Sequence, residues 1–374
     1  GKVVAAGPAS AVKTPAGLPT VDLKGKTIIP GLIATHVHIS DVDGLKLPAY
    51  TEANTQRQLA LFARYGITTL WSLGGEKAAA FQARDSQNTP ALKRSRLYLS
   101  GDVIVGKTPA EARAMVADMA GKKVDIIKIR VDDQLKTATK MTPDVYKAVI
   151  DEAHKRGLPV AAHIFYLEDA KGLLKAGVDF IAHSVRDQEV DAEFLQLMKQ
   201  RNIPYSPTLT REISTFIYES TPKWFSDPFF TREADPAVVA QLQEPKRQQA
   251  MAQNAAAKAY KAALPTAMRN LKKVSDAGIR VIMGTDSGAT ANRFEGYFEH
   301  LEMDMMADAG MTPLQILRSA TGEAAAGMKM KGVGTLTPGN WADFLVLDRN
   351  PLTDIRNTKS LSKVYIAGNP VPVQ

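Results

Sequence analysis

Between residues 27 and 287 the chain alternates short apolar segments with longer amphipathic ones. Helical patterns separate most of the apolar segments; one runs from Pro143, at a first helical position, to Gly157 at its end. Strands and helices in alternation favour a closed parallel (β/α)8 barrel of the TIM type over an open sheet. The segments are almost continuously apolar, as expected where helices bury the outer face of a sheet. The eight expected strands are TIIPGLIATHVH, ITTLWSL, RLYLSGDVI, VDIIKIRVD, LPVAAHI, DFIAHSV, IPYSPTLT and RVIMGTDS.

The two ends of the chain have a different pattern. Residues 1–27 and 338–374 contain short β-type runs interrupted by glycine, proline and asparagine. Two β-rich ends flanking a barrel over 28–337 predict one small β-domain assembled from both termini. Gly1 leads directly into an expected hairpin tip, so we expect the first strands of that domain to be missing from this sequence.

A long segment separates the last two expected strands, running about seventy residues where a barrel unit needs far fewer. It contains the aromatic, proline-rich stretch STFIYESTPKWFSDPFFTREADP, followed by a helix rich in alanine, glutamine and lysine. Surface decoration is one interpretation. A lid over the substrate near residues 211–265 is favoured, because the segment follows the end of a barrel strand at which active sites lie.

Composition narrows the range of functions. The net charge is +8, but lysine and arginine are interleaved with acidic residues, so we expect no nucleic-acid partner. No apolar run approaches the ~18 residues of a membrane span, and GKVVAAGPAS lacks the apolar core of a signal peptide. The absence of cysteine excludes disulfides, thiolate ligands and cysteine nucleophiles. We expect a soluble cytoplasmic or periplasmic protein that acts on a small molecule, and the sequence is compatible with a homo-oligomer.

Histidines are few, and most of them lie at expected strand ends. In THVHIS, His36 and His38 are two residues apart and project to the same face of a strand, as a pair of metal ligands would. An isolated H-x-H can equally be two packed or solvent-facing side chains. His163 closes LPVAAHI, His183 lies in DFIAHSV and Asp286 closes RVIMGTDS. Four of the six histidines and one aspartate therefore mark the mouth of the predicted barrel.

The remaining two histidines have other settings. His154 in DEAHKRG is expected on the surface of a helix, and His300 in GYFEHLEMD is a core, capping or ligand-supporting residue.

These motifs closely resemble the amidohydrolase superfamily of metal-dependent hydrolases. The matching elements are PGLIATHVH, Lys128 at the end of DIIKIRVD, His163, His183 and GTDSG. MTPLQILRSATGEAAAGM and GTLTPGNWADFLVLDRNPLTDI match the closing segment of the superfamily. The resemblance covers essentially the whole chain and is strongest to the imidazolonepropionase-like branch that includes Xaa-Pro and Xaa-Arg dipeptidases. It implies a barrel with a β-sandwich formed by both termini.

The resemblance also implies a binuclear metal centre. His36, His38 and Asp286 would hold a more buried divalent ion, zinc being the expected metal, and His163 and His183 a more exposed one. Lys128 would bridge both as a carboxylated lysine, because an ordinary lysine amine, with a pKa near ~10.4, is protonated and a poor ligand. From the residues alone, Lys128 could instead pair with the substrate, or with Asp125 or Asp132.

A mechanism follows from this ligand set. Two metals share a water and lower its pKa, so that a metal-bound hydroxide attacks the substrate carbonyl. Asp286 is then both ligand and general base, passing a proton to the leaving nitrogen. The favoured reaction is hydrolysis of an amide-type C–N bond in a dipeptide or an N-acyl amino acid. Esters, lactones, carbamates or phosphotriesters are the alternative substrates, and a non-catalytic binding protein on the same scaffold is a third interpretation.

Side chains that follow the strand ends are candidates for substrate binding. Arginines among them could hold a carboxylate in a bidentate manner, although local ion pairs are an equal alternative for each. Two features depart from the dipeptidase pattern: Ile164 and Phe165 follow His163 where relatives place a second histidine and a glycine, and the segment after strand seven is unusually long. The candidates are Arg130, Tyr166, Arg186, Thr208 and Arg211.

Overall fold

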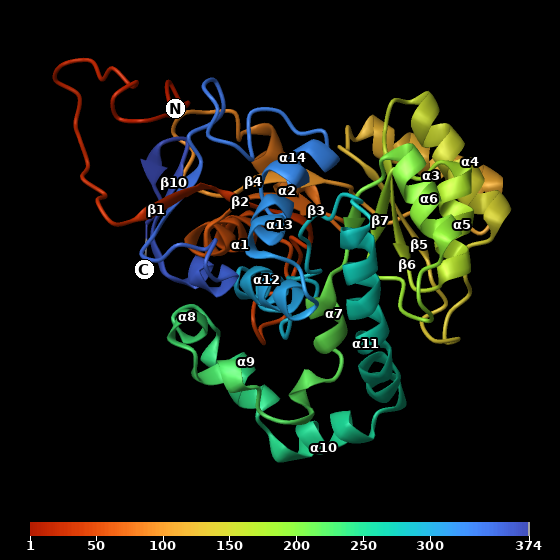
Figure 1. Ribbon diagram of the computed structural model, residues 1–374. Helices are drawn as coiled ribbons and strands as arrows, with labels where there is room; N and C mark the ends of the chain where they lie inside the picture. Colours follow the sequence, from red (N-terminus) through yellow and green to blue (C-terminus); the bar gives the residue numbers. More distant parts are fainter. Residues whose placement is uncertain (373–374) are drawn as a thin grey trace.

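The computed structural model describes residues 1–372. Seven of the eight expected barrel strands form two parallel sheets, with the orders β2-β3-β4 and β5-β6-β7-β8 (Figure 1). The expected pattern of parallel strands is confirmed, except that Thr27–Pro30, expected at the start of the first barrel strand, forms β1 of a separate antiparallel sheet. The strands are β2 (Leu32–Val37), β3 (Ile67–Ser72), β4 (Arg96–Leu99), β5 (Ile127–Val131), β6 (Val160–Ile164), β7 (Phe180–Ala182) and β8 (Tyr205–Ser206).

Single parallel bridges close these sheets into a barrel. Ile104 pairs with Ile129 and joins the first sheet to the second. The eighth expected strand, RVIMGTDS, is bridged from Val281 to β8 and from Ser287 to β2. Gly284 explains the close approach of this segment to β2, because a Cβ there would lie 2.8 Å from the Cβ of His36. The side chains that end β2 and the eighth strand are thereby held together.

Helices cover the outside of the barrel. In α4 (Pro143–Lys155) proline lies in the first turn and Gly157 follows the helix in a left-handed conformation, as expected. Its Val145, Tyr146 and Val149 are buried in the main hydrophobic core. The other barrel helices are α1 (Glu52–Arg64), α2 (Ala78–Asp85), α3 (Pro109–Gly121), α5 (Leu167–Ala176), α6 (Ala192–Arg201), α11 (Ala255–Asp276), α12 (Tyr297–Asp308), α13 (Pro313–Ser319) and α14 (Gly322–Gly327).

Both chain ends contribute to one antiparallel sheet with the order β1-β9-β10-β11, so the β-rich domain expected from the termini is confirmed. Within residues 1–372 it takes the form of a single four-stranded sheet. The described residues before β1 form no strand and contribute one isolated antiparallel bridge, between Lys2 and Trp341. The strands are β1 (Thr27–Pro30), β9 (Phe344–Leu347), β10 (Leu361–Ile366) and β11 (Asn369–Pro370), with the 3-10 helix η3 (Ile355–Lys359) between β9 and β10.

The long segment after β8 is helical and extends below the barrel in Figure 1, where it returns through α11. Its aromatic stretch is packed: Trp224 and Phe230 meet edge to face at 4.8 Å between ring centroids, and Phe230 meets Tyr297 of α12 at 4.9 Å. The segment is thus anchored on α12, and its role as a lid stays a prediction. Its elements are α7 (Leu209–Ile213), η1 (Ile217–Glu219), η2 (Lys223–Ser226), α8 (Pro228–Thr231), α9 (Pro236–Leu242) and α10 (Pro245–Gln253).

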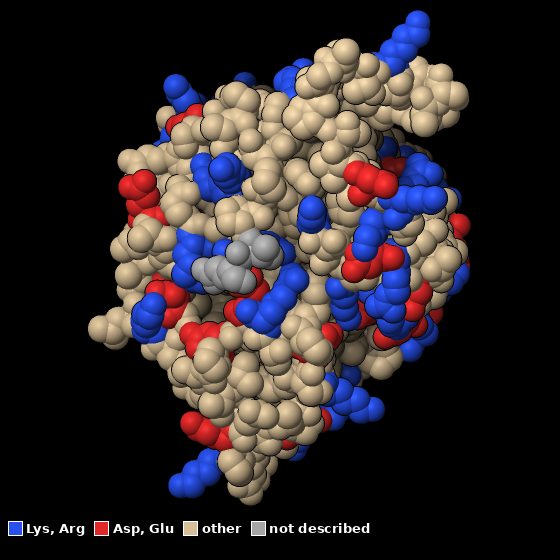
Figure 2. Space-filling model, turned by 90° about the vertical axis from the view of Figure 1, so that its left-hand side faces the viewer, with Lys and Arg blue, Asp and Glu red and all other residues tan. Residues whose placement is uncertain are grey.

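Two surface properties bear on the sequence expectations. On the face shown in Figure 2, lysine and arginine are interspersed with aspartate and glutamate rather than gathered into one basic patch. Among the described residues, no helix has the length and apolar character required to cross a bilayer.

Candidate metal centre

The ends of the barrel strands bring all six predicted metal ligands to one cavity of about 270 Å³. Hydrophobic side chains on one part of its wall come from the segments that follow β3 and β4, and several cationic and polar side chains complete the wall. The ligand candidates are His36, His38, Lys128, His163, His183 and Asp286; the rest of the lining is Leu73, Val103, Val105, Arg130, Gln134, Arg211 and Arg293.

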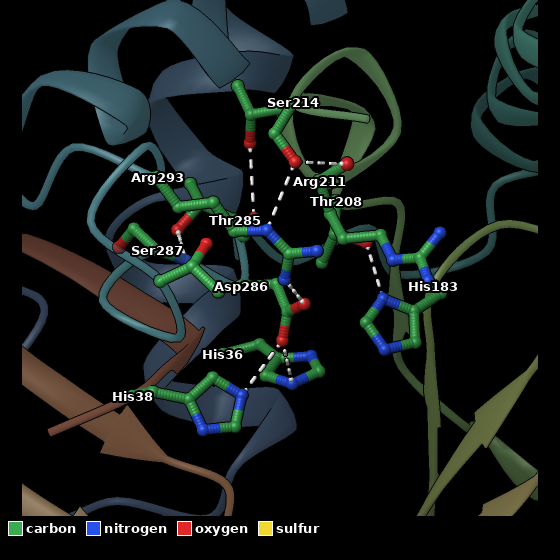
Figure 3. A network of polar contacts seen from close by, with 12 residues as sticks. His36, His38, His183, Thr208, Arg211, Ser214, Thr285, Asp286, Ser287 and Arg293 are labelled. Atoms are coloured by element: carbon green, nitrogen blue, oxygen red, sulfur yellow. Dashed lines mark hydrogen bonds and ion pairs between the residues drawn. The ribbon is translucent and has the colours of Figure 1, made fainter. Parts of the chain in front are cut away.

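Asp286 is the centre of the first donor group. Its Oδ1 lies 3.1 Å from His36 Nε2 and 2.8 Å from His38 Nε2 (Figure 3). One ligand atom from each of His36, His183 and Asp286 falls within 4.8 Å of the other two, which fits a single divalent ion. The rings of His163 and His183 are 4.1 Å apart between centroids, so the imidazole of His163 lies beside this group of three ligand candidates.

Two of the imidazoles, those of His36 and His163, are held in the neutral form that metal ligation requires. Burial, helped by the nearby Lys128 charge, lowers the pKa of His36 to about 3, and burial also lowers the pKa of His163 to about 3. Nδ1 of His36 is buried with no hydrogen-bond partner in the described chain. Neutral nitrogens with free lone pairs, converging on a carboxylate, match the chemistry of a zinc-type donor set.

Neighbouring groups fix the orientation of three of these rings. His38 Nδ1 lies 3.1 Å from the carbonyl oxygen of Gly74, and His183 Nδ1 lies 2.7 Å from Thr208 Oγ1. His163 Nε2 lies 2.8 Å from Asp132 Oδ2, so Nδ1 is the ring nitrogen that could offer a lone pair to a metal ion. Partners of this kind orient metal-ligating histidines in general.

Lys128 is buried beside His36, with 3.3 Å between Lys128 Nζ and His36 Nε2. Burial lowers the pKa of its amine to about 8, against the opposing charges of Asp286 and Glu76. The neutral fraction of this amine near physiological pH is therefore larger than that of an ordinary lysine, and it is the neutral amine that reacts with carbon dioxide. The carboxylates that could have paired with it are engaged elsewhere, because Asp125 pairs with Arg84 at 2.9 Å and Asp132 bonds His163.

Three residues of the site adopt left-handed backbone conformations that non-glycine residues rarely take. The φ angles are 74° at His183, 47° at Thr208 and 63° at Asp286. Each lies just past the end of a barrel strand, where the chain turns sharply. Such conformations cost of order 1–3 kcal/mol each and concentrate at functional sites. Their presence at all three turns therefore supports a functional role for this cavity.

The sequence did not point to two charged residues: Arg293 in the cavity wall, and Glu76, whose partner Gly74 contacts His38. Arg293 forms an ion pair with Asp286 Oδ2 and donates from Nε to Ser214 Oγ at 3.0 Å. It lies in an irregular loop, and no motif in the sequence marks it. Glu76 is buried and accepts a hydrogen bond from the Gly74 amide at 2.8 Å. In the sequence, its position shortly after the expected strand ITTLWSL is the feature that could have indicated a place near the barrel mouth.

The five substrate-binding candidates separate into two groups. Arg130 and Arg211 line the cavity. Tyr166 and Arg186 do not belong to the cavity wall, because the Tyr166 hydroxyl donates to Asp133 at 2.8 Å and the Arg186 guanidinium is buried against Glu212 at 3.0 Å. Thr208 belongs to the second group as well, because it is not part of the cavity wall and contacts His183 instead.

The two histidines outside the cavity also have defined places. His154 lies 2.8 Å from Asp179 with a side chain that is 40% exposed, as expected for a surface helix. His300 is fully buried, with Nε2 2.8 Å from the carbonyl oxygen of Tyr65 and Nδ1 3.0 Å from Thr358 Oγ1. It is a core residue, one of the roles left open by the sequence.

The chain is similar in sequence or in fold to several known proteins. Ochratoxinase of Aspergillus niger is 25% identical over 284 residues, which cover 72% of this chain and 51% of that protein. An uncharacterised protein of Mycobacterium bovis is 27% identical over 201 residues, so the chain spans about half the length of the curated relatives it matches. A solved structure of a Xaa-Pro dipeptidase with bound methionine has a TM-score of 0.75 and 22% identity, covering 96% of this chain and 90% of that one.

The family model named Amidohydrolase family matches residues 27–371. That range contains every barrel strand and all six ligand candidates, which confirms the resemblance predicted from the motifs. The chain belongs to the amidohydrolase family.

Proposed function

We propose that the protein is a metal-dependent hydrolase that cleaves an amide-type C–N bond in a dipeptide or an N-acyl amino acid. The convergence of His36, His38, Lys128, His163, His183 and Asp286 on one cavity is the observation that carries this proposal. Membership of the amidohydrolase family supports hydrolysis of a C–N bond. The fold shared with a dipeptidase that holds methionine supports a substrate with an amino-acid part.

The donors divide between two divalent ions, for which zinc is the favoured metal. His36, His38 and Asp286 would hold one ion, and His163 and His183 the second. Lys128, carboxylated at its amine, would bridge them; its burial and lowered pKa support this role. When bound, the ions would supply a Lewis acid and lower the pKa of water.

The chain's own groups complete the chemistry. Asp286 would accept the proton of the attacking water on a carboxylate oxygen and deliver it to the leaving nitrogen. Arg130 and Arg211 on the cavity wall would hold a substrate carboxylate, while Leu73, Val103 and Val105 would contact an apolar side chain. Substrates of this kind combine an anionic end with an apolar group.

The test is hydrolysis by the purified full chain, supplied with zinc and bicarbonate, of dipeptides and N-acyl amino acids beside matched esters and lactones. We expect amide cleavage that stops on treatment with a chelator and returns with zinc. Asp286→Asn should abolish it at saturating metal, whereas Asp151→Asn, on the exposed face of α4, should not. Hydrolysis confined to esters or lactones, or full activity in Asp286→Asn, would contradict the proposal.

A further inference from the structure

The two oxygens of Asp286 face different groups. Oδ1 is turned toward His36 and His38, whereas Oδ2 contacts Nη1 of Arg293 (Figure 3). Arg293 is held from its other side by Ser214 Oγ, 3.0 Å from Nε. Neither partner is free in solvent, because the side chains of Arg293 and Asp286 are only 15% and 10% exposed. The oxygen that points away from the histidines is therefore covered by a guanidinium.

A second guanidinium lines the same cavity. Arg211 comes from α7, lies over the ring of Tyr260 at 4.6 Å and pairs with Glu212 at 3.2 Å. Its Nε is buried and has no hydrogen-bond partner in the described chain. In Figure 3, Arg211 and Arg293 lie on the same side of the histidines.

Like charges in one cavity repel, and an unpaired buried N–H is unfavourable. Both conditions are relieved by an anion between the two arginines. A carboxylate suits the position because it can accept two parallel N–H donors from each guanidinium. Arg293 can present both of its Nη atoms to such a carboxylate by turning from Asp286, since Nη1 otherwise contacts that residue.

We propose that Arg293 is a specificity-determining residue that exchanges partners: it covers Asp286 Oδ2 in the free protein and, with Arg211, holds the carboxylate of an anionic substrate in the complex. This inference rests on the proposed function, because it names the substrate end that the hydrolase selects. An uncharged substrate leaves Arg293 on Asp286, and the oxygen that has to accept a proton stays covered. Discrimination between charged and uncharged substrates then falls on kcat as well as on KM.

A matched ligand pair tests the exchange. N-acetyl-L-leucine and N-acetyl-L-leucinamide differ only in the carboxylate, and calorimetry measures their binding to the chelator-treated full chain without any need for turnover. We expect the acid to bind about ten- to a hundredfold more tightly than the amide, as a charge-assisted contact implies. Arg293→Met should remove most of that preference and Arg293→Lys should keep part of it. Arg113→Met, which alters a half-exposed arginine on α3, should leave it intact.

A second test measures kcat for hydrolysis of the same two compounds by the zinc-loaded protein. The wild-type ratio of acid to amide in kcat should fall toward one in Arg293→Met, mainly through faster turnover of the amide. Arg293→Met with undiminished preference for the acid in calorimetry would overturn the inference, and so would an unchanged kcat ratio. If the loaded wild type hydrolyses neither this pair nor any of the dipeptides and N-acyl amino acids tested for the proposed function, that function fails, while the binding preference still decides the role of Arg293.

Discussion

Thr208 Oγ1 lies 2.7 Å from Nδ1 of His183, and both residues have left-handed backbone conformations. The hydroxyl holds the imidazole at Nδ1, so Nε2 of the ring is left to face the other ligand candidates. Because β8 ends at Ser206 and β7 at Ala182, the contact joins the turns that follow two neighbouring strands. Thr208 was expected to touch the substrate; its position in the structure points to an effect on metal binding.

Thr208→Val keeps the branched shape and removes the hydroxyl. We expect about ten- to a hundredfold weaker metal binding, the usual effect of losing a group that orients a ligating histidine. Competition with a chromogenic chelator measures this affinity directly. Thr208→Ser, which keeps the hydroxyl, should stay close to the wild type. A raised KM with unchanged metal affinity in the valine variant would instead assign Thr208 to the substrate.

Lys128 gives a prediction about metal content. Lys128→Ala removes the proposed bridge, so metal analysis should fall from about two ions per chain to about one or fewer. Lys147→Ala, on the exposed face of α4, is the matched control and should retain the full content. Mass spectrometry under native conditions should show an added carbon dioxide on the wild type and none on Lys128→Ala. Two ions per chain in Lys128→Ala would argue against a bridging lysine.

Most of the barrel was predictable because its strands and helices have distinct hydrophobic periods. The metal ligands were predictable for a related reason: parallel strands end at the same mouth, so residues such as His163 and His183 must meet once the strands are placed. Arg293 was not predictable, since it lies in a loop whose path depends on packing rather than on periodicity. The same holds for Arg186, because nothing in the sequence reveals that Glu212 lies beside it in the core.

Arg96 and Asp343 form an ion pair between the barrel and the terminal sheet, with 2.8 Å between Arg96 Nε and Asp343 Oδ2 and side chains 2% and 4% exposed. Arg96→Met leaves a buried carboxylate without its partner, so the free energy of unfolding should fall by about 3–5 kcal/mol. Denaturant titration followed by fluorescence measures it. Lys26→Ala breaks the exposed pair with Asp348 and should cost no more than about 1 kcal/mol. Equal losses of unfolding free energy in the two variants would show that burial does not increase the contribution of the Arg96–Asp343 pair to stability.

His300 predicts a pH dependence of stability that is separate from the metal site. Burial lowers the pKa of its imidazole to about 3, while the unfolded chain titrates near 6.5. The unfolded state therefore binds a proton first as the pH falls below 6.5, so this contribution to stability is complete above that pH and declines between 6.5 and about 3. One such group accounts for up to about 1.4 kcal/mol per pH unit.

His300→Gln should isolate this term, because glutamine can still donate to the carbonyl of Tyr65 but does not titrate. We expect the variant to be less stable than the wild type at pH 7.5 and the gap to narrow by about 1 kcal/mol or more on going to pH 5. Other buried groups contribute equally to both proteins and cancel in the difference, including Glu299, whose pKa burial raises to about 7. Denaturant unfolding of the chelator-treated proteins at the two pH values measures the gap. A gap of constant size would mean that His300 is not held neutral by its burial among Tyr65, Phe229 and Thr358.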